Sequence, residues 1–313
     1  MRSDVTPVDR PSPGHAEAPS AWPVPSWTEP AIQALGRSDS LNALGRRLSN
    51  TFYRFVRPGK LKDVLAGTWI AHPLHPMLTD VTIGAWTSAT ILDVLGGEKV
   101  QPGADMLVGV GILSAVPTAI TGLSDLTDIV DREDRGVATA HAIANAGGLV
   151  LWTVSYLARK TGNRRAGRSL SFAGTVMMTC AGFLGGHLSY RRGVGVDQTA
   201  FDQRFEDWTA VTDESELKEG QARRVLVSGI NVFLYRTGSG IFALANRCSH
   251  RGGPLHKGSV DETSVTCPWH LSAFRLADGA VLRGPATAPQ PAYQVRIRDG
   301  KIEIRERSTG QVH

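Results

Sequence analysis

The chain has 313 residues and a formal net charge of +5. This basic charge fits a protein at an anionic membrane surface, and no motif indicates that the chain recognises nucleic acid. Its three cysteines leave no pair for a structural disulfide if two of them bind a metal. No apolar run follows a basic N-terminus, so no cleavable signal peptide is expected.

Two segments precede the first long apolar region. Residues 1–30 are rich in Pro, Ser and Ala, which predicts a disordered tail. Residues 31–66 are predicted to be an amphipathic helical segment with arginines off its apolar stripe. The stripe consists of Leu41, Leu44, Leu48, Phe52 and Phe55. A basic amphipathic helix can lie on an anionic membrane surface or pack on the neighbouring domain, and both interpretations stay open.

Four apolar segments predict a transmembrane bundle over residues 67–196. Each is near the roughly 20 residues needed to cross the hydrocarbon core. They are 77–95, 104–123, 137–157 and 169–188. Lys and Arg are absent from these segments and cluster in the connections, which argues against a soluble four-helix bundle. Gly, Ala, Ser and Thr are frequent and favour close helix packing in lipid. The acidic connection at 125–134 is interpreted as a solvated loop.

Two stretches of this region resemble a known family. Residues 67–76 read GTWIAHPLHP, and residues 185–196 read GGHLSYRRGVGV. Both resemble an uncharacterised bacterial four-helix membrane domain, domain of unknown function 2231, in which an HPLHP box precedes the first helix. The resemblance covers residues 60–196. It implies an architecture and no activity, because the family has none established.

The histidines of the predicted bundle share one level. With four spans, both ends of the chain lie on the same side of the membrane. His72 and His75 precede the first span, and His141 lies near the start of the third. His187 lies near the end of the fourth. All four are therefore predicted at the membrane face that carries the C-terminal domain. Ionisable groups at membrane depth are costly and are functional candidates.

Two interpretations of these histidines stay open. One is a second redox or metal site: a haem b with His141 and His187 as axial ligands, or a quinone site. The other is structural, with the first two histidines capping a helix and His141 pairing with Asn145 or Asp80.

Two Cys-His pairs stand out in the last third of the chain. Cys248 and His250 are followed, after a sixteen-residue gap, by Cys267 and His270. Two Cys and two His suit a Rieske [2Fe–2S] centre, in which thiolates hold one iron and imidazoles the other. They also suit structural zinc. Paired glycines after the first histidine let the backbone approach a cluster.

The two loops resemble the Rieske family, which favours the cluster over zinc. The loops read CSHRGGPL at 248–255 and CPWH at 267–270. The resemblance implies that the two cysteines bind one iron and the two histidines the other. Respiratory members carry a further cysteine in each loop, and these form a disulfide. Gly253 and Trp269 stand at those positions, so the domain is similar to the ferredoxin type that serves oxygenases.

Other residues are interpreted through the same resemblance. Ser272 matches a hydroxyl donor to a cluster sulfur, and Phe274 stands where high-potential members have tyrosine. Losing one donor implies a potential of roughly −150 to +100 mV. Pro285 lies in a stretch similar to the third loop, which shields the cluster. Leu271 replaces the usual glycine, which leaves the shape of the second loop open. After His270 the sequence has no histidine before His313. The histidine and carboxylate ligands that bind a mononuclear iron in oxygenase catalytic subunits are therefore absent.

The surrounding sequence predicts an all-β domain over 205–306, after a linker at 197–204 and before a tail at 307–313. Apolar or alternating runs predict strands, and Asp-Gly pairs at 278–279 and 299–300 predict hairpins. The strands are expected at 224–227, 232–235, 241–244, 293–297 and 302–304. The expected fold is thus a multidomain α + β protein, with a four-helix transmembrane bundle followed by an all-β Rieske domain.

This organisation predicts a membrane-tethered electron-transfer protein. It would pass single electrons between a reductase or quinol and an oxygenase or respiratory partner. The alternatives are a quinone- or haem-linked oxidoreductase that uses the bundle histidines, and a redox sensor. The expected partners are a redox protein or quinone and membrane lipid; no oligomeric state follows from the sequence. The distribution of Lys and Arg favours a multi-pass protein of the bacterial inner membrane with a cytoplasmic Rieske domain.

Overall fold

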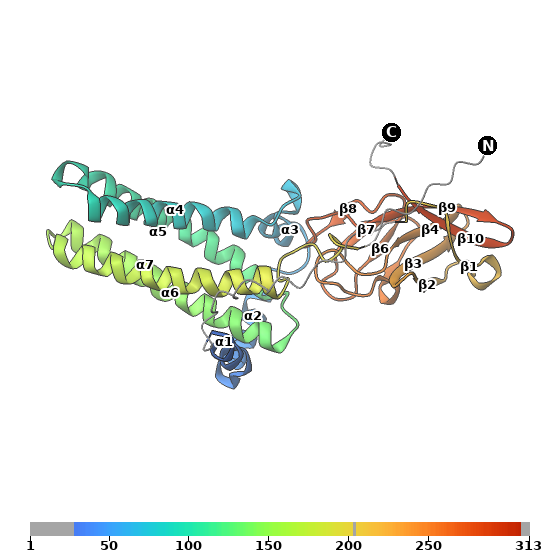
Figure 1. The fold of residues 1–313 in the computed structure, drawn as a ribbon, viewed down its shortest axis with the longest axis horizontal. Coiled ribbons are helices and arrows are strands. Elements are labelled where there is room, and N and C mark those ends of the chain that lie inside the picture. The colour runs from blue at the N-terminus through green and yellow to red at the C-terminus, as the bar shows by residue number, and fades with distance from the viewer. Residues whose placement is uncertain (1–27, 203–204, 308–313) are drawn as a thin grey trace, which may run out of the picture.

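The computed structural model describes residues 28–202 and 205–307, which form a helical part and a β part lying end to end (Figure 1). The helices are α1 (Thr28–Arg37), α2 (Asp39–Tyr53), α3 (Lys60–Ala66), α4 (Leu74–Leu95), α5 (Gln101–Leu126), α6 (Arg132–Lys160) and α7 (Arg164–Gly186). The strands are β1 (Thr209–Asp213), β2 (Ala222–Val227), β3 (Ile230–Thr237), β4 (Gly240–Ala245), β5 (Ser259–Val260), β6 (Ser264–Thr266), β7 (Ala273–Arg275), β8 (Val281–Arg283), β9 (Ala292–Arg298) and β10 (Lys301–Glu306).

The four longest helices, α4 to α7, pack into an elongated bundle (Figure 1). Helix α4 packs on α5 and α7, and α6 packs on the same two helices. Trp86 and Trp152 stack inside the bundle with ring centroids 5.1 Å apart. Gly111 and Gly174 make room for these rings, because a Cβ atom at either position would overlap the facing indole. Small residues therefore set the close helix spacing that their abundance predicts.

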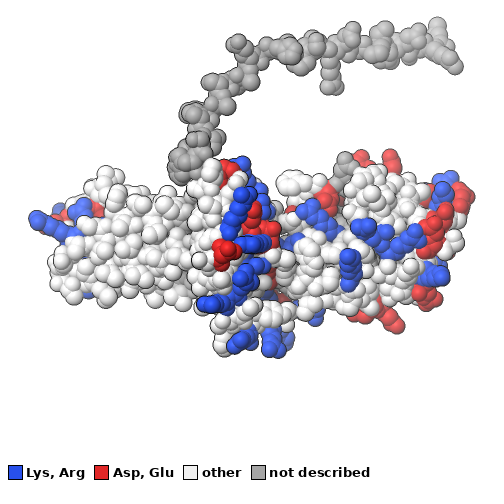
Figure 2. All heavy atoms as spheres, turned by 90° about the horizontal axis from the view of Figure 1, so that it is seen from below, with Lys and Arg blue, Asp and Glu red and all other residues white. Residues whose placement is uncertain are grey.

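The outside of the bundle is largely apolar. Figure 2 shows an uncharged surface over the helices, between a small charged tip and a dense belt of charge beside the β part. Among the described residues, three helical segments are long and apolar enough to cross a membrane. They are Glu98–Leu126, Arg132–Lys160 and Arg164–Arg191.

The predicted four-helix domain needs a correction. The described helical part has seven α-helices, and three segments meet the length and hydropathy criterion for spanning a membrane. Helix α4 occupies the first predicted span and is not among them. It contains Asp80, Asp93 and several threonines, whose polar side chains lower its mean hydropathy.

Residues 28–66 form three helices, where the sequence predicted one amphipathic segment after a tail ending at residue 30. Residues 1–27 of that tail lie outside the described residues. Helix α2 packs on α5 and α6 through a face that contains buried Asn42 and Gly45. Part of the apolar stripe points outward, since Leu44 is 39% exposed. Phe55, which follows the end of α2, is 75% exposed. The helix therefore packs on the bundle and still presents apolar side chains.

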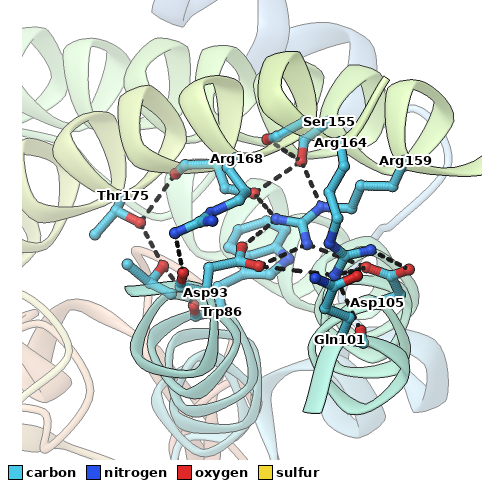
Figure 3. Close-up of polar contacts among 12 residues, drawn as sticks. Trp86, Asp93, Gln101, Asp105, Ser155, Arg159, Arg164, Arg168 and Thr175 are labelled. Carbon is cyan, nitrogen blue, oxygen red and sulfur yellow. Dashed lines mark hydrogen bonds and ion pairs between the residues drawn. The ribbon is translucent and has the colours of Figure 1, made fainter. Parts of the chain in front are cut away.

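Charged side chains from all four long helices meet where α4 leads into α5 and α6 leads into α7, at the end of the bundle farthest from the β part (Figure 1). Figure 3 shows their contacts. The Arg159 side chain of α6 is fully buried and contacts Asp93 of α4 and Asp105 of α5, the latter at 3.1 Å. Arg164 of α7 also pairs with Asp105, at 3.0 Å. Unpaired, such charges would be costly in an apolar setting, so the network ties the helix ends together.

The β part consists of two antiparallel sheets. The larger has the strand order β1-β10-β9-β4-β3-β2, and the smaller has the order β5-β6-β7-β8. Strands β2, β3, β4, β9 and β10 confirm the predicted apolar runs. The pair Asp299–Gly300 forms the predicted two-residue turn, with both φ angles positive. Consecutive residues Val232, Phe233 and Leu234 of β3 are all fully buried, because each face of the strand packs on a different hydrophobic cluster.

Candidate iron–sulfur centre

Two tight loops carry the four predicted ligands. The first follows β4, and the second joins β6 to β7. The amide of Cys248 donates to the carbonyl oxygen of Gly253 at 2.9 Å, which closes the first loop. The amide of Cys267 donates to the carbonyl oxygen of Ser272 at 2.8 Å, which closes the second. Each loop thus holds its cysteine at the end of a strand and presents its histidine two or three residues later.

The two cysteines lie together in the core of the β part. Cys248 and Cys267 are almost fully buried, and their sulfurs are hydrogen-bonded to each other. This contact raises the pKa of the Cys248 thiol and lowers the pKa of Cys267 to about 7. Backbone amides also donate to the sulfurs; they belong to His250, Arg251, Trp269 and His270. Sulfurs so close, with donors already directed at them, suit two thiolates on one iron.

The two histidines form a second pair. The rings of His250 and His270 have centroids 5.0 Å apart and are nearly perpendicular. Burial lowers the pKa of His250 well below its usual range and also lowers the pKa of His270. Both imidazoles are therefore neutral at physiological pH, the form that binds a metal. Nδ1 of His250 is buried and has no hydrogen-bond partner among the described residues, although buried polar atoms normally have one. Iron coordination would satisfy it.

The arrangement fits a two-iron cluster better than a single zinc ion. A tetrahedral zinc site brings all four ligand atoms to about 2.0–2.3 Å from one ion. No three described His, Cys, Asp or Glu side chains are placed to hold a single ion. The site instead consists of a sulfur pair and an imidazole pair, as two irons with different ligands require.

Gly253 and Trp269 lie in contact across the two loops. A Cβ atom at Gly253 would be 2.6 Å from Cys267 Sγ and 3.1 Å from Trp269 Cγ. The indole ring therefore occupies the space beside the glycine. The structure brings together the two positions where the family resemblance implies a disulfide in respiratory members.

Three further predicted residues surround the site. The Oγ atom of buried Ser272 accepts a hydrogen bond from the amide of Ala286 at 3.0 Å, so its own hydrogen is free to point to a sulfur. Phe274 is fully buried beside the cysteines and offers no hydroxyl group. Pro285 is buried in the loop after β8, next to the residue that anchors Ser272.

Leu271 settles the shape of the second loop. It adopts a left-handed conformation with φ of 63°, which glycine favours and leucine does not. Its amide donates to the carbonyl oxygen of Cys267 at 3.1 Å, and its own carbonyl accepts from Arg283 at 3.0 Å. The loop keeps the conformation that the usual glycine would allow.

Sequence reasoning missed Gln290. Its side chain is buried, and its Oε1 accepts from the amide of Ser249 at 2.9 Å. Its Nε2 donates to the carbonyl oxygens of Ala245 and Arg247, both at 2.7 Å. One glutamine thus fixes the first cluster loop. The sequence indicated this role only through the position of a glutamine between Pro289 and Pro291.

Sequence reasoning also missed contacts between the cluster loops and the helical part. The connection after α5 was interpreted as a solvated loop, but Asp128 within it is buried. Its Oδ2 atom lies 3.5 Å from Nε2 of His250 and 2.8 Å from Nζ of Lys62. Asp63 of α3 accepts from the amide of Gly284 at 2.9 Å. The acidic connection therefore meets the imidazole edge of the site.

The bundle histidines lie at the end of the bundle beside the β part. His72 is exposed, and His187 begins a π-helical turn. Nδ1 of His75 contacts the carbonyl oxygen of Thr118 at 3.0 Å. Nδ1 of His141 contacts the carbonyl oxygen of Ala181 at 2.8 Å, and its Nε2 contacts the Asn145 amide at 3.1 Å. Both ring nitrogens of His141 already have partners, so an axial haem ligand there would have to exchange one of these contacts. The haem or quinone site stays a prediction.

Comparison with known proteins agrees with both parts of the chain. Residues 207–294 match the Rieske [2Fe-2S] domain, and residues 71–198 match the family described as Predicted membrane protein (DUF2231). Ferredoxin CarAc of Metapseudomonas resinovorans is 29% identical over 98 residues, which are 31% of this chain and 92% of the relative. The 3-phenylpropionate/cinnamic acid dioxygenase ferredoxin subunit of Escherichia coli (strain K12) is 34% identical over 91 residues, or 29% of this chain and 85% of the relative.

A solved structure is also similar to the β part. The ferredoxin of carbazole 1,9a-dioxygenase from Nocardioides aromaticivorans IC177 is 28% identical, with a TM-score of 0.31. The match covers 33% of this chain and 100% of the ferredoxin. On the matched sequences and the paired ligands, the chain belongs to the Rieske [2Fe–2S] family through its β part, with a [2Fe–2S] cluster as cofactor, and joins this domain to a helical part that matches the DUF2231 family model.

Proposed function

We propose that this protein is a membrane-anchored electron carrier that passes single electrons between a reductase or quinol and an oxygenase or respiratory partner. The observation that supports this most directly is that the paired sulfurs of Cys248 and Cys267 lie beside two neutral imidazoles. One of these, His250, has a buried Nδ1 atom without a hydrogen-bond partner among the described residues. When bound there, a [2Fe–2S] cluster supplies reversible one-electron reduction.

The residues around the ligands serve this role by setting the potential. Backbone amides directed at the cysteine sulfurs, and a Ser272 hydroxyl whose hydrogen is not used by the Ala286 amide, would stabilise an electron added to the cluster. Phe274 withholds a further donor. Burial of both cysteines keeps water from the sulfur side of the site.

The helical part supports membrane anchoring. Its apolar zone lies between two charged zones in Figure 2, as expected for a bundle that crosses a bilayer. Exposed aromatic residues occur near the end beside the β part, where an aromatic belt is expected. They are Tyr53, Phe55, Trp69 and Tyr190. We place α5, α6 and α7 across the bacterial inner membrane and α4 beside them as a fourth span, because α4 has 22 residues and packs on α5 and α7 despite its lower hydropathy. The Rieske domain then lies on the cytoplasmic side.

The relatives favour a protein partner. The Escherichia coli relative is named as the ferredoxin subunit of a dioxygenase. By analogy, the cluster of this protein would reduce an oxygenase brought to the membrane surface. Quinol as the electron donor belongs to the same proposal, because the site lies at the end of a membrane-type bundle.

Electron counting tests the proposal. The full chain, purified in detergent without oxygen, is titrated with dithionite while the visible absorption of the oxidised cluster is followed. One electron per chain should bleach it fully, and a one-electron acceptor such as ferricyanide should restore it. The His270→Ala variant serves as the control without a cluster. A chain that takes up two electrons, or none, would contradict the proposed carrier.

Quinol and protein donors are then compared on the same preparation. Decylubiquinol is mixed with the oxidised protein in one arm, and NADH with a ferredoxin reductase in the other. Reduction in either arm supports the proposed role. Failure of both, with a cluster that dithionite reduces normally, would refute these donors.

A further inference from the structure

The imidazole edge of the site is covered by the helical part of the same chain. Asp128 lies 3.5 Å from Nε2 of His250, the ring nitrogen opposite the unpartnered Nδ1. If Nδ1 binds iron, Nε2 carries the hydrogen and can donate it to this carboxylate. The side chain of His250 is only 13% exposed as a result of this packing.

The carboxylate is held in a fixed position. Lys62 of α3 has a side chain that is only 2% exposed, and its Nζ lies 2.8 Å from Asp128 Oδ2. The same ammonium group donates to the carbonyl oxygen of Ser124 at 2.6 Å and to Thr127 Oγ1 at 3.0 Å. All three of its hydrogens therefore have acceptors, so the lysine orients the carboxylate rather than rotating freely.

Contacts on the other side of the site continue the interface. The amide of Gly284 donates to Asp63 Oδ1 at 2.9 Å, and Thr68 Oγ1 donates to the carbonyl oxygen of Ala286 at 3.1 Å. These two contacts flank Pro285. The loop that shields the site is thus itself bound by α3 and the turn after it.

Charge also matches across this interface. Arg251, directly after the first histidine ligand, is half-buried and is attracted electrostatically by Asp125, Asp128 and Asp134 of the helical part. The basic residue comes from the β part, and the acidic residues come from the end of α5, the following loop and the start of α6. Opposite charges on the two faces favour one docked orientation.

We propose that α3 and the connection after α5 form an intramolecular docking site for the cluster edge, in which Asp128 is a positioning residue that holds His250 and lowers the reduction potential. The proposal rests on the cluster and carrier role given above. Reduction adds negative charge to the cluster, and a nearby carboxylate opposes that addition. A carboxylate that accepts from the imidazole also makes the ring a stronger donor to iron, which favours the oxidised state.

Redox titration of the full chain tests the role of Asp128. Asp128→Asn should raise the midpoint potential, because it removes the charge and keeps the shape. Asp128→Glu should restore most of the lower value. The matched control is Asp299→Asn in the β9–β10 turn, where the side chain is 91% exposed and the same charge is removed. An Asp128→Asn potential equal to that of wild type, with the cluster spectrum intact, would overturn the proposal and leave the carrier role standing.

A second variant tests the docking without touching Asp128. Asp63→Ala removes the acceptor of the Gly284 amide on the other side of the interface. In wild type this amide should exchange slowly with deuterium, and in the variant it should exchange faster while the midpoint potential rises. Unchanged exchange and potential would refute the docking site, including in the case where Asp128→Asn fails to fold. A wild-type chain without a cluster spectrum would instead refute the proposed function itself.

Discussion

Replacing Gly253 by alanine should disrupt the cluster, because the structure has no space for a methyl group there. The added Cβ would lie 2.6 Å from Cys267 Sγ and 3.1 Å from Trp269 Cγ. Favourable heavy-atom contacts need about 3.5–4.0 Å, so the first distance falls short by roughly 1 Å. Overpacking of this kind typically costs about 1–3 kcal/mol. The strained atom here is a predicted iron ligand, so the displacement acts on cluster binding directly.

Iron and acid-labile sulfide per chain provide the assay, together with the electron paramagnetic resonance spectrum of the reduced protein. Gly253→Ala should bind less iron and sulfide than wild type, or show an altered spectrum. The matched control is Gly238→Ala in the same domain, where a Cβ atom would meet only the Glu219 carboxylate, at 3.3 Å. Full occupancy with an unchanged spectrum in Gly253→Ala would refute the contact between the two loops.

Other variants test separate parts of the structure. Arg159→Met removes the guanidinium that contacts buried Asp93 and leaves Asp105 with Arg164 alone, so it should lower the free energy of unfolding in detergent by about 3–5 kcal/mol, whereas exposed Arg165→Met should not; equal thermal unfolding would contradict the network. Ser272→Ala should lower the midpoint potential and Phe274→Tyr should raise it, both with intact clusters, and two unchanged potentials would argue against hydrogen bonding at sulfur. Leu271→Gly should stabilise the domain by up to about 1 kcal/mol, because it relieves a left-handed leucine; a destabilised variant would show that its side chain matters more than its backbone.

The site ligands could be predicted from sequence because they are close in the chain. Cys248 and His250 share one loop, and Cys267 and His270 share the other, so their spacing indicates a metal site, and the resemblance of the two loops to the Rieske family favours a cluster over zinc. The hairpin at Asp299–Gly300 is equally local, since a two-residue turn with positive φ angles demands such residues. In both cases a few neighbouring residues determine the structure.

Contacts between the two parts of the chain could not be predicted in this way. Asp128 stands in an acidic stretch that has the composition of a solvated loop, and nothing near it in sequence indicates His250. Lys62 similarly appears as one of several basic residues at a helix start, although it is buried against the loop. Their roles follow from the packing of segments far apart in the chain, which residue spacing does not encode.

The packing of the helical part was likewise only partly predictable from the sequence. Apolar composition indicated membrane-type helices, but it did not reveal that residues 28–66 divide into three helices. Nor did it reveal the paired Trp86 and Trp152, which depend on glycines of facing helices. Arg159 follows the predicted apolar segment 137–157, where the sequence places basic residues in a connection, whereas its side chain turns inward to two carboxylates. Burial of a charge depends on its partners, and those come from other helices.

Metal and sulfide content test most directly whether Cys248, His250, Cys267 and His270 hold a two-iron cluster. The full chain, purified in detergent without oxygen, should contain two iron atoms and two acid-labile sulfides, with an absorption spectrum of the Rieske type. His250→Cys should lower the midpoint potential, because a thiolate adds negative charge beside the iron. One zinc ion per chain, without iron or sulfide, would contradict the cluster and the electron-transfer role together.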